Sequence, residues 1–72
     1  MPTNSRVLFG KRIRELRLKQ KWSQEKLAEM ASLSTAYVSD IERGRRNVGL
    51  TIVLKLARAF KVDAGKLFKG VR

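Results

Sequence analysis

Residues 23–44 read SQEKLAEMASLSTAYVSDIERG, and the spacing of their apolar side chains predicts two short helices joined by a tight turn. Ser23 and Ser34 are favourable N-caps, so we expect helices over residues 24–31 and 35–43, with Gly44 ending the second. The turn between them is short. Two short helices connected in this way form a unit of the helix-turn-helix type.

The same stretch separates a packing side from an outer side. Its small or apolar positions are Leu27, Ala28, Ala31, Leu33, Val38 and Ile41. The outer face of the second helix then carries Thr35, Ala36, Ser39, Asp40 and Arg43. A helix with short polar side chains on its outer face and an exposed N-terminus suits the major groove of DNA.

Apolar spacing is helical along the rest of the chain as well. We expect further helices over residues 5–21, 50–61 and 64–68. The chain is therefore predicted to be an all-α, compact five-helix bundle that forms a single domain over residues 1–72, with loose ends at 1–4 and 70–72. Gly10 lies inside the first helix, where glycine costs about 1 kcal/mol relative to alanine, and the sequence gives no reason for it.

Composition limits the classes of function. The chain has 72 residues with neither cysteine nor histidine, which removes disulfides, thiolate nucleophiles, imidazole bases and the usual zinc ligands. We therefore expect no enzymatic activity, no cofactor, no metal site and no small-molecule ligand. A domain of this size has a limited core, so dimerisation is the expected source of added stability.

The charge points to a polyanionic partner. Seventeen Lys and Arg residues against six Asp and Glu residues give a net charge of +11, which favours nucleic acid first and an anionic membrane second. The sequence shows neither a secretory signal nor an apolar segment long enough to span a bilayer. Basic side chains of the first helix are expected to form a solvated face that attracts the partner at long range: Lys11, Arg12, Arg14, Lys19 and Lys21.

Three motifs, read together, resemble a known family. They are IRELR at residues 13–17, WSQEKLA at 22–28 and YVSDIERG at 37–44. In this order and spacing, they make most of the chain similar to Cro/phage-repressor helix-turn-helix domains, which have a lambda-repressor-like DNA-binding fold. The run TAYVSDIERGRRN at residues 35–47 looks most like the controller proteins of restriction–modification operons.

The resemblance implies a sequence-specific transcription regulator that binds double-stranded DNA as a homodimer on an inverted-repeat operator. Such a protein is expected in the cytoplasm of a bacterium, encoded by the host or a phage and associated with the nucleoid. The resemblance also assigns the reading of bases to Ser34, Thr35, Ala36, Ser39 and Asp40. It assigns the binding of phosphates to Gln24, Tyr37, Arg43, Arg45, Arg46 and Asn47.

Two of these residues keep alternative roles. Asp40 either accepts a hydrogen bond from a cytosine or holds a neighbouring arginine in place. Tyr37 either packs against the protein or donates to a phosphate. Arg17 and Glu42 match a pair that is ion-paired in the family, and we expect this pair rather than a further phosphate contact from Arg17.

The chain also departs from the family pattern. Ser32 stands at the turn where the family usually has glycine, and a left-handed backbone there would cost serine about 1 kcal/mol. Residues 48–49 are Val-Gly where the family often has Pro-Ser. Trp22 and Phe9 are expected to pack in the core rather than to stack on bases.

The C-terminal third contains more apolar side chains than one small core requires. Candidates for a two-fold interface are Leu54, Val62, Leu67 and Phe68, together with Val71. Part of this set must belong to the core, and the sequence does not divide it.

Two other functions remain alternatives to a DNA-binding regulator. One is a nucleic-acid-associated interaction module or an antitoxin acting through a protein partner, which equal affinity for random RNA and for the best DNA duplex would favour. The other is a membrane-surface peptide, suggested by the basic first helix, which helicity in the absence of lipid would exclude.

Overall fold

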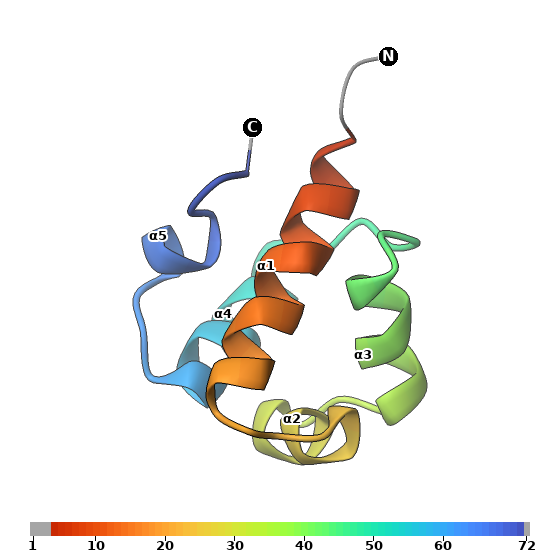
Figure 1. Cartoon of the computed structure of the whole chain (residues 1–72), viewed down its shortest axis with the longest axis vertical. Coiled ribbons are helices and arrows are strands. Elements are labelled where there is room, and N and C mark those ends of the chain that lie inside the picture. The colour runs from red at the N-terminus through yellow and green to blue at the C-terminus, as the bar shows by residue number, and fades with distance from the viewer. Residues whose placement is uncertain (1–3, 72) are drawn as a thin grey trace.

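The computed structural model describes residues 4–71 and, within them, an all-α arrangement of five helices (Figure 1). The helices are α1 (Ser5–Lys19), α2 (Gln24–Ala31), α3 (Thr35–Glu42), α4 (Leu50–Phe60) and α5 (Ala64–Leu67). The predicted all-α, five-helix fold is confirmed. Residues 1–3 and 72, which belong to the ends expected to be loose, lie outside the described residues. Among the described helices, none has the length and apolar character needed to cross a lipid bilayer.

Helix α1 runs through the middle of the molecule and packs against α3 on one side and α5 on the other (Figure 1). Helix α2 lies at the opposite end from the two described chain ends and packs against α3 and α4. Each of the five described helices contributes to the core. The largest fully buried side chains are Ile13, Leu27, Val38, Ile41, Leu56 and Leu67. Burying one such aliphatic side chain stabilises a fold by about 1.5–3 kcal/mol.

Two aromatic pairs close the core at its edges. The ring of Phe9 is buried and lies 5.2 Å, between ring centroids, from that of Phe68. Trp22 stacks on Phe60 with 5.6 Å between ring centroids. Both packing predictions, for Phe9 and for Trp22, are confirmed.

Several helices end one or two residues earlier than predicted. Helix α1 ends at Lys19 rather than at residue 21, and α4 ends at Phe60 rather than at residue 61. The reason is the same in both places, because Lys21 and Lys61 adopt left-handed backbone conformations with φ of 59° and 56°. Helices α3 and α5 also end one residue earlier than predicted, at Glu42 and Leu67. Helices of this kind fray at their ends, so these differences leave the fold unchanged.

Ser32 has the left-handed backbone that the family pattern implies for this turn. Its φ and ψ are 55° and 46°, and it forms the C-cap of α2. The next residue closes the turn, because the backbone N–H of Leu33 donates to the carbonyl of Ala28 at 2.8 Å. The turn therefore has the left-handed geometry that is usual for glycine, and this backbone conformation is less favourable for Ser32 than it would be for glycine.

Replacing Ser32 by glycine is expected to raise the free energy of unfolding by about 0.5–1 kcal/mol, because glycine adopts this conformation without steric cost. The gain stays modest because glycine also has more freedom in the unfolded chain. Urea denaturation of the wild type and the variant measures it. Ser32→Ala is the matched control and should give no gain, since alanine keeps the Cβ. Equal stability of Ser32→Gly and Ser32→Ala would contradict the account.

The close crossing of α1 and α3 explains Gly10. A Cβ on this residue would lie 2.3 Å from the carbonyl oxygen of Ile41 and 2.8 Å from that of Glu42. Both oxygens belong to the backbone of α3, so they cannot swing away as a side chain does. Gly10 is therefore what allows α3 to lie directly against α1.

Arg12 does not belong to the solvated face expected for the first helix. Its side chain is only 10% exposed, and it pairs with Glu15 one turn further along α1. Its Nε donates to the carbonyl oxygen of Lys66 at 3.0 Å, which links α1 to the last described helix. The neighbouring Lys11 and Arg14 are exposed, as expected.

Candidate nucleic-acid interface

Helix α3 is anchored by its inner side and leaves its outer side accessible. Val38 and Ile41 are buried in the core. The hydroxyl oxygen of Ser34 caps the helix by accepting from the backbone N–H of Tyr37 at 3.0 Å. Beyond this cap, Thr35 and Ala36 are exposed, whereas Ser39 and Asp40 are half-buried. The residues predicted to read bases therefore come together on one rigidly held helix, although their contact with bases stays a prediction.

The residues predicted to bind phosphates follow this helix in the chain. Arg43, Arg45, Arg46 and Asn47 are all exposed. Gly44, with a φ of 73°, ends the helix as predicted, and the N–H of Arg45 donates to the carbonyl of Asp40 at 2.9 Å. The basic segment therefore leaves α3 in a defined direction.

Asp40 and Tyr37 both contact Arg46. The Nε of Arg46 donates to Oδ2 of Asp40 at 3.3 Å. The guanidinium carbon of Arg46 lies 4.4 Å from the centroid of the Tyr37 ring. Of the two roles open for Asp40, the structure shows the one in which it holds an arginine. Tyr37 packs partly buried against the core while its ring supports the same arginine.

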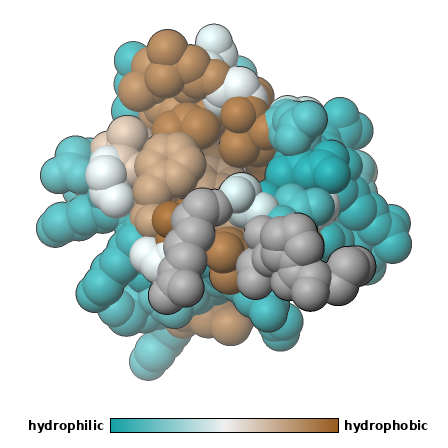
Figure 2. All heavy atoms as spheres, turned by 90° about the horizontal axis from the view of Figure 1, so that it is seen from above, coloured by the Kyte–Doolittle hydropathy of each residue, from teal (hydrophilic) through white to brown (hydrophobic). Residues whose placement is uncertain are grey.

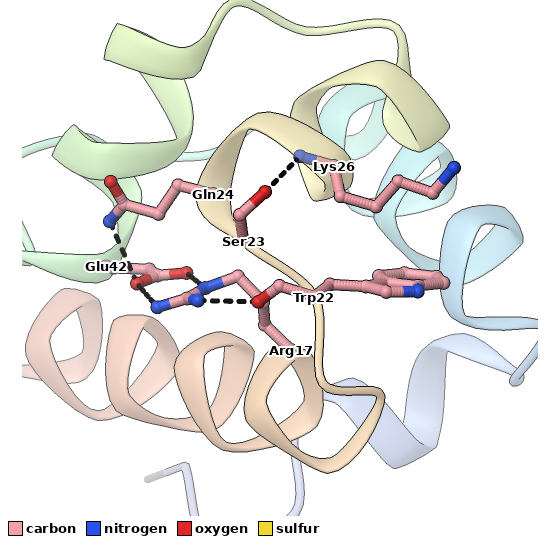
Figure 3. Close-up of polar contacts among 6 residues, drawn as sticks. All are labelled: Arg17, Trp22, Ser23, Gln24, Lys26 and Glu42. Atoms are coloured by element: carbon pink, nitrogen blue, oxygen red, sulfur yellow. Dashed lines mark hydrogen bonds and ion pairs between the residues drawn. The ribbon is translucent and has the colours of Figure 1, made fainter.

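The predicted ion pair between Arg17 and Glu42 is confirmed (Figure 3). It is bidentate, since Arg17 Nε donates to Oε2 at 2.7 Å and Nη2 donates to Oε1 at 3.0 Å. Nη1 of Arg17 donates to the carbonyl oxygen of Trp22 at 2.8 Å. The two side chains are only 11% and 5% exposed. The pair joins α1 to the end of α3 and to the segment that leads into α2.

Gln24 is drawn into the same network (Figure 3). Its Nε2 donates to Oε1 of Glu42 at 3.1 Å, which fixes the amide at the first residue of α2. A hollow of about 190 Å³ opens here between α1, α2 and the end of α3. Its lining residues are Arg14, Arg17, Gln24, Glu42 and Arg43. Phosphate binding by Gln24 stays a prediction, and the surroundings are basic enough to attract an anion.

Arg14 is a candidate that the sequence analysis did not assign to this surface. It is exposed and lines the hollow beside Gln24 and Arg43. The signal was present in the sequence, because Arg14 lies three residues before Arg17. Residues at this spacing are neighbours on a helix surface.

The structure divides the apolar residues proposed for a two-fold interface. Leu67 is fully buried in the core of the single chain, so its assignment to the interface is wrong. Val62 and Val71 are partly buried against that core. Leu54 and Phe68 remain 40% and 42% exposed, and Leu50, which was not predicted, is 73% exposed. Leu50 precedes Leu54 by four residues, the helical spacing that places both on one face of α4.

Known proteins resemble the chain over most of its length. A model of the helix-turn-helix family matches residues 13–67. Control protein C.BamHI from Bacillus amyloliquefaciens is 49% identical over 64 residues, covering 88% of this chain and 79% of that protein. Control protein C.SmaI from Serratia marcescens is 35% identical over 60 residues, covering 83% and 71%. The crystal structure of the restriction–modification controller protein C.AhdI from Aeromonas hydrophila matches with a TM-score of 0.85 and 48% identity, covering 88% of this chain and 96% of that one.

Proposed function

Since the chain belongs to the helix-turn-helix family and is a DNA-binding regulator of transcription, not an enzyme, we propose that it is the controller of a restriction–modification operon. We further propose that it acts in the bacterial cytoplasm as a homodimer on an inverted-repeat operator. The relatives named as controllers support the first proposal. The second rests on the outer face of α3, on the basic residues beside it and on the exposed apolar side chains.

The accessible outer face of α3 is the main support for sequence-specific recognition of DNA bases. The cap formed by Ser34 and the buried anchors Val38 and Ile41 hold this helix, while Thr35 and Ala36 stand exposed at its start. A short polar side chain and a methyl group at the start of a recognition helix are suited to base edges and to the methyl group of thymine. We propose that Thr35 and Ser39 donate to base edges.

Phosphate contacts are proposed on both sides of this helix. Gln24 lies at the start of α2, and Arg14 of α1 lines the same hollow. The exposed segment after α3 supplies Arg43, Arg45 and Asn47. The start of a helix favours an anion, because its backbone N–H groups point outward and its dipole is positive there. Contacts of this kind position the protein on the duplex, and their number sets the salt dependence of binding.

The exposed apolar side chains support pairing with a second copy of the chain. Figure 2 looks onto the end of the molecule where the described chain begins and ends, and apolar side chains gather there. A shallow hollow on the molecule has a mixed lining of four apolar and four polar or basic residues: Phe9, Val48, Phe68 and Val71 with Ser5, Arg6, Arg46 and Asn47. We propose that Phe68, together with Leu50 and Leu54 of α4, contacts the second copy, because all three are exposed apolar side chains. Contiguous exposed apolar surface marks an interaction site more often than chance exposure does.

Selection of binding sites from a random DNA duplex pool, at near-physiological salt, tests the proposal. We expect an inverted repeat whose half-sites lie about one helical turn apart, because two recognition helices related by a two-fold axis read two successive major grooves. The selected site should bind at least about 1,000-fold more tightly than random duplex. In the source genome it should lie beside genes for a restriction endonuclease and a methyltransferase.

The variant Thr35→Ala identifies the reading face in the same experiment. It should relax the preference at one position of each half-site, since one base contact is worth about 1–3 kcal/mol of discrimination. An unchanged preference would remove Thr35 from the reading face. Enrichment of single half-sites would contradict the dimer. No enrichment, with salt-sensitive binding to every duplex and to RNA, would instead favour an interaction module or antitoxin that works through a protein partner.

A further inference from the structure

Arg46 is held in place by two different contacts before any DNA is bound. Its Nε donates to the carboxylate of Asp40, and its guanidinium carbon lies over the ring of Tyr37. A guanidinium has five N–H donors, and the contact with Asp40 uses one of them. The Arg46 side chain remains 48% exposed, and that of Asp40 is 32% exposed. The arginine is thus oriented but still accessible from solvent.

We propose that Asp40 determines specificity without touching a base, by holding Arg46 over Tyr37 and withholding its charge from the phosphates of non-operator DNA. The proposal deepens the function proposed above and rests on it. It names Asp40 as a positioning residue for Arg46, and not as an acceptor for cytosine.

The physical reason lies in how the two kinds of binding arise. Binding to random duplex comes almost wholly from cations that neutralise phosphates. An arginine already paired with a carboxylate contributes less to it, because a phosphate must displace Asp40 or accept the negative charge of Asp40 nearby. Discrimination is a difference between two affinities, so an unfavourable charge facing the wrong ligand raises it.

On the operator the same contacts are an advantage. Base contacts made by α3 fix where the phosphates lie relative to the protein. An arginine that is already oriented by Asp40 and Tyr37 loses little conformational freedom when its remaining donors meet an acceptor there. The arrangement therefore weakens binding to random duplex more than binding to the operator.

The variant Asp40→Asn removes the charge and retains an oxygen that can accept from Arg46. We expect its affinity for a scrambled duplex to rise about fivefold, with the slope of log affinity against log salt steeper by about 0.9, as for one added phosphate contact. Affinity for the selected operator should change less, so that the ratio of the two affinities falls severalfold. The base preference in a repeated selection should stay the same.

The matched control is Glu29→Gln, which changes the net charge by the same amount. Glu29 lies exposed on α2, with one carboxylate oxygen 3.6 Å from Nζ of Lys26. It is remote from Arg46 in sequence and lies on α2, whereas Asp40 is on α3 and Arg46 is in the segment after α3. Its substitution should raise affinity for the scrambled duplex much less and leave the salt slope near that of the wild type.

The effect of Asp40→Asn should also be measured in a protein that carries Arg46→Gln. Without the arginine there is no charge to release, so Asp40→Asn should have no further effect on the salt slope in that background. Should Asp40→Asn fail to fold, Arg46→Gln alone still decides, because it should weaken binding to the operator more than binding to the scrambled duplex.

Three outcomes overturn the proposal. They are an effect of Asp40→Asn no larger than that of Glu29→Gln, an effect that persists in the Arg46→Gln background, and a changed base preference at one position of the operator. The last would make Asp40 a base reader. If the wild type selects no operator, the proposed function fails, whereas the salt slope on scrambled duplex still reports whether Asp40 restrains Arg46.

Discussion

Replacing Glu42 by alanine is expected to lower the free energy of unfolding by about 3–5 kcal/mol, the cost of leaving one member of a buried ion pair without its partner. Arg17 is 11% exposed and directs two of its donors to this carboxylate. Without Glu42, a guanidinium stays buried with only the carbonyl of Trp22 as an acceptor. Gln24 loses its acceptor as well. Domains of this size have a total stability of about 4–11 kcal/mol, so the variant should be close to unfolding.

Urea denaturation followed by circular dichroism measures this loss. Glu29→Ala is the control, because its exposed pair with Lys26 should contribute less than about 1 kcal/mol. The double variant Arg17→Met with Glu42→Leu should be more stable than Glu42→Ala alone, since no charge is then left buried. A loss below about 1 kcal/mol for Glu42→Ala would show that Arg17 finds water instead, and would contradict the account.

Local patterns in the sequence predicted the parts of the fold that depend on neighbours along the chain. Ser23 and Ser34 cap their helices through contacts with a backbone N–H three residues away, so each cap can be recognised from a short segment. Apolar side chains at helical spacing likewise identified the inner faces of α2 and α3. The pair between Arg17 and Glu42 spans 25 residues, and only the resemblance to a family supplied it.

Other contacts between distant segments were not predicted. Arg12 meets the carbonyl of Lys66, which lies 54 residues away, and no pattern along the chain links the two. Leu67 and Phe68 are adjacent, yet one is fully buried and the other is 42% exposed. Phe68 is the C-cap that follows Leu67 at the end of α5. Successive residues of a helical turn point about 100° apart, so a small rotation decides which of the two enters the core. Leu67 and Phe68 are both apolar, and no pattern in the sequence predicts which of them this rotation buries.

The contact between Asp40 and Arg46 shows the same limit within the candidate site. Both side chains were predicted to face DNA, and their residue types alone are consistent with two arrangements. The choice between them depends on the path of the chain after Gly44, which returns Arg46 to the outer face of α3. A backbone path of this kind depends on packing, because Gly44 lies against Val7 of α1.

Gly10→Ala is the substitution for which helix propensity and tertiary packing predict opposite results. Inside a helix, alanine is favoured over glycine by about 1 kcal/mol, so propensity alone predicts a more stable protein. The added methyl group, however, would lie 2.3 Å from the carbonyl oxygen of Ile41 in the backbone of α3. The two helices must move apart, which disturbs the packing of Ile13 and Val38, both fully buried. We expect a net loss of about 3 kcal/mol or more in the free energy of unfolding.

Thermal and urea unfolding of Gly10→Ala measure this loss, with Gly49→Ala as the control. A Cβ at Gly49 meets nothing within 4 Å, and its backbone φ of −78° suits any residue. That variant should lose no more than about 1 kcal/mol, the value of glycine over alanine at a helix N-cap. The crossing also fixes α3 against the rest of the molecule, so Gly10→Ala should weaken operator binding even where enough protein stays folded to measure it. A variant as stable as the wild type would mean that α1 and α3 separate at little cost, and the rigid presentation of α3 would then need another cause.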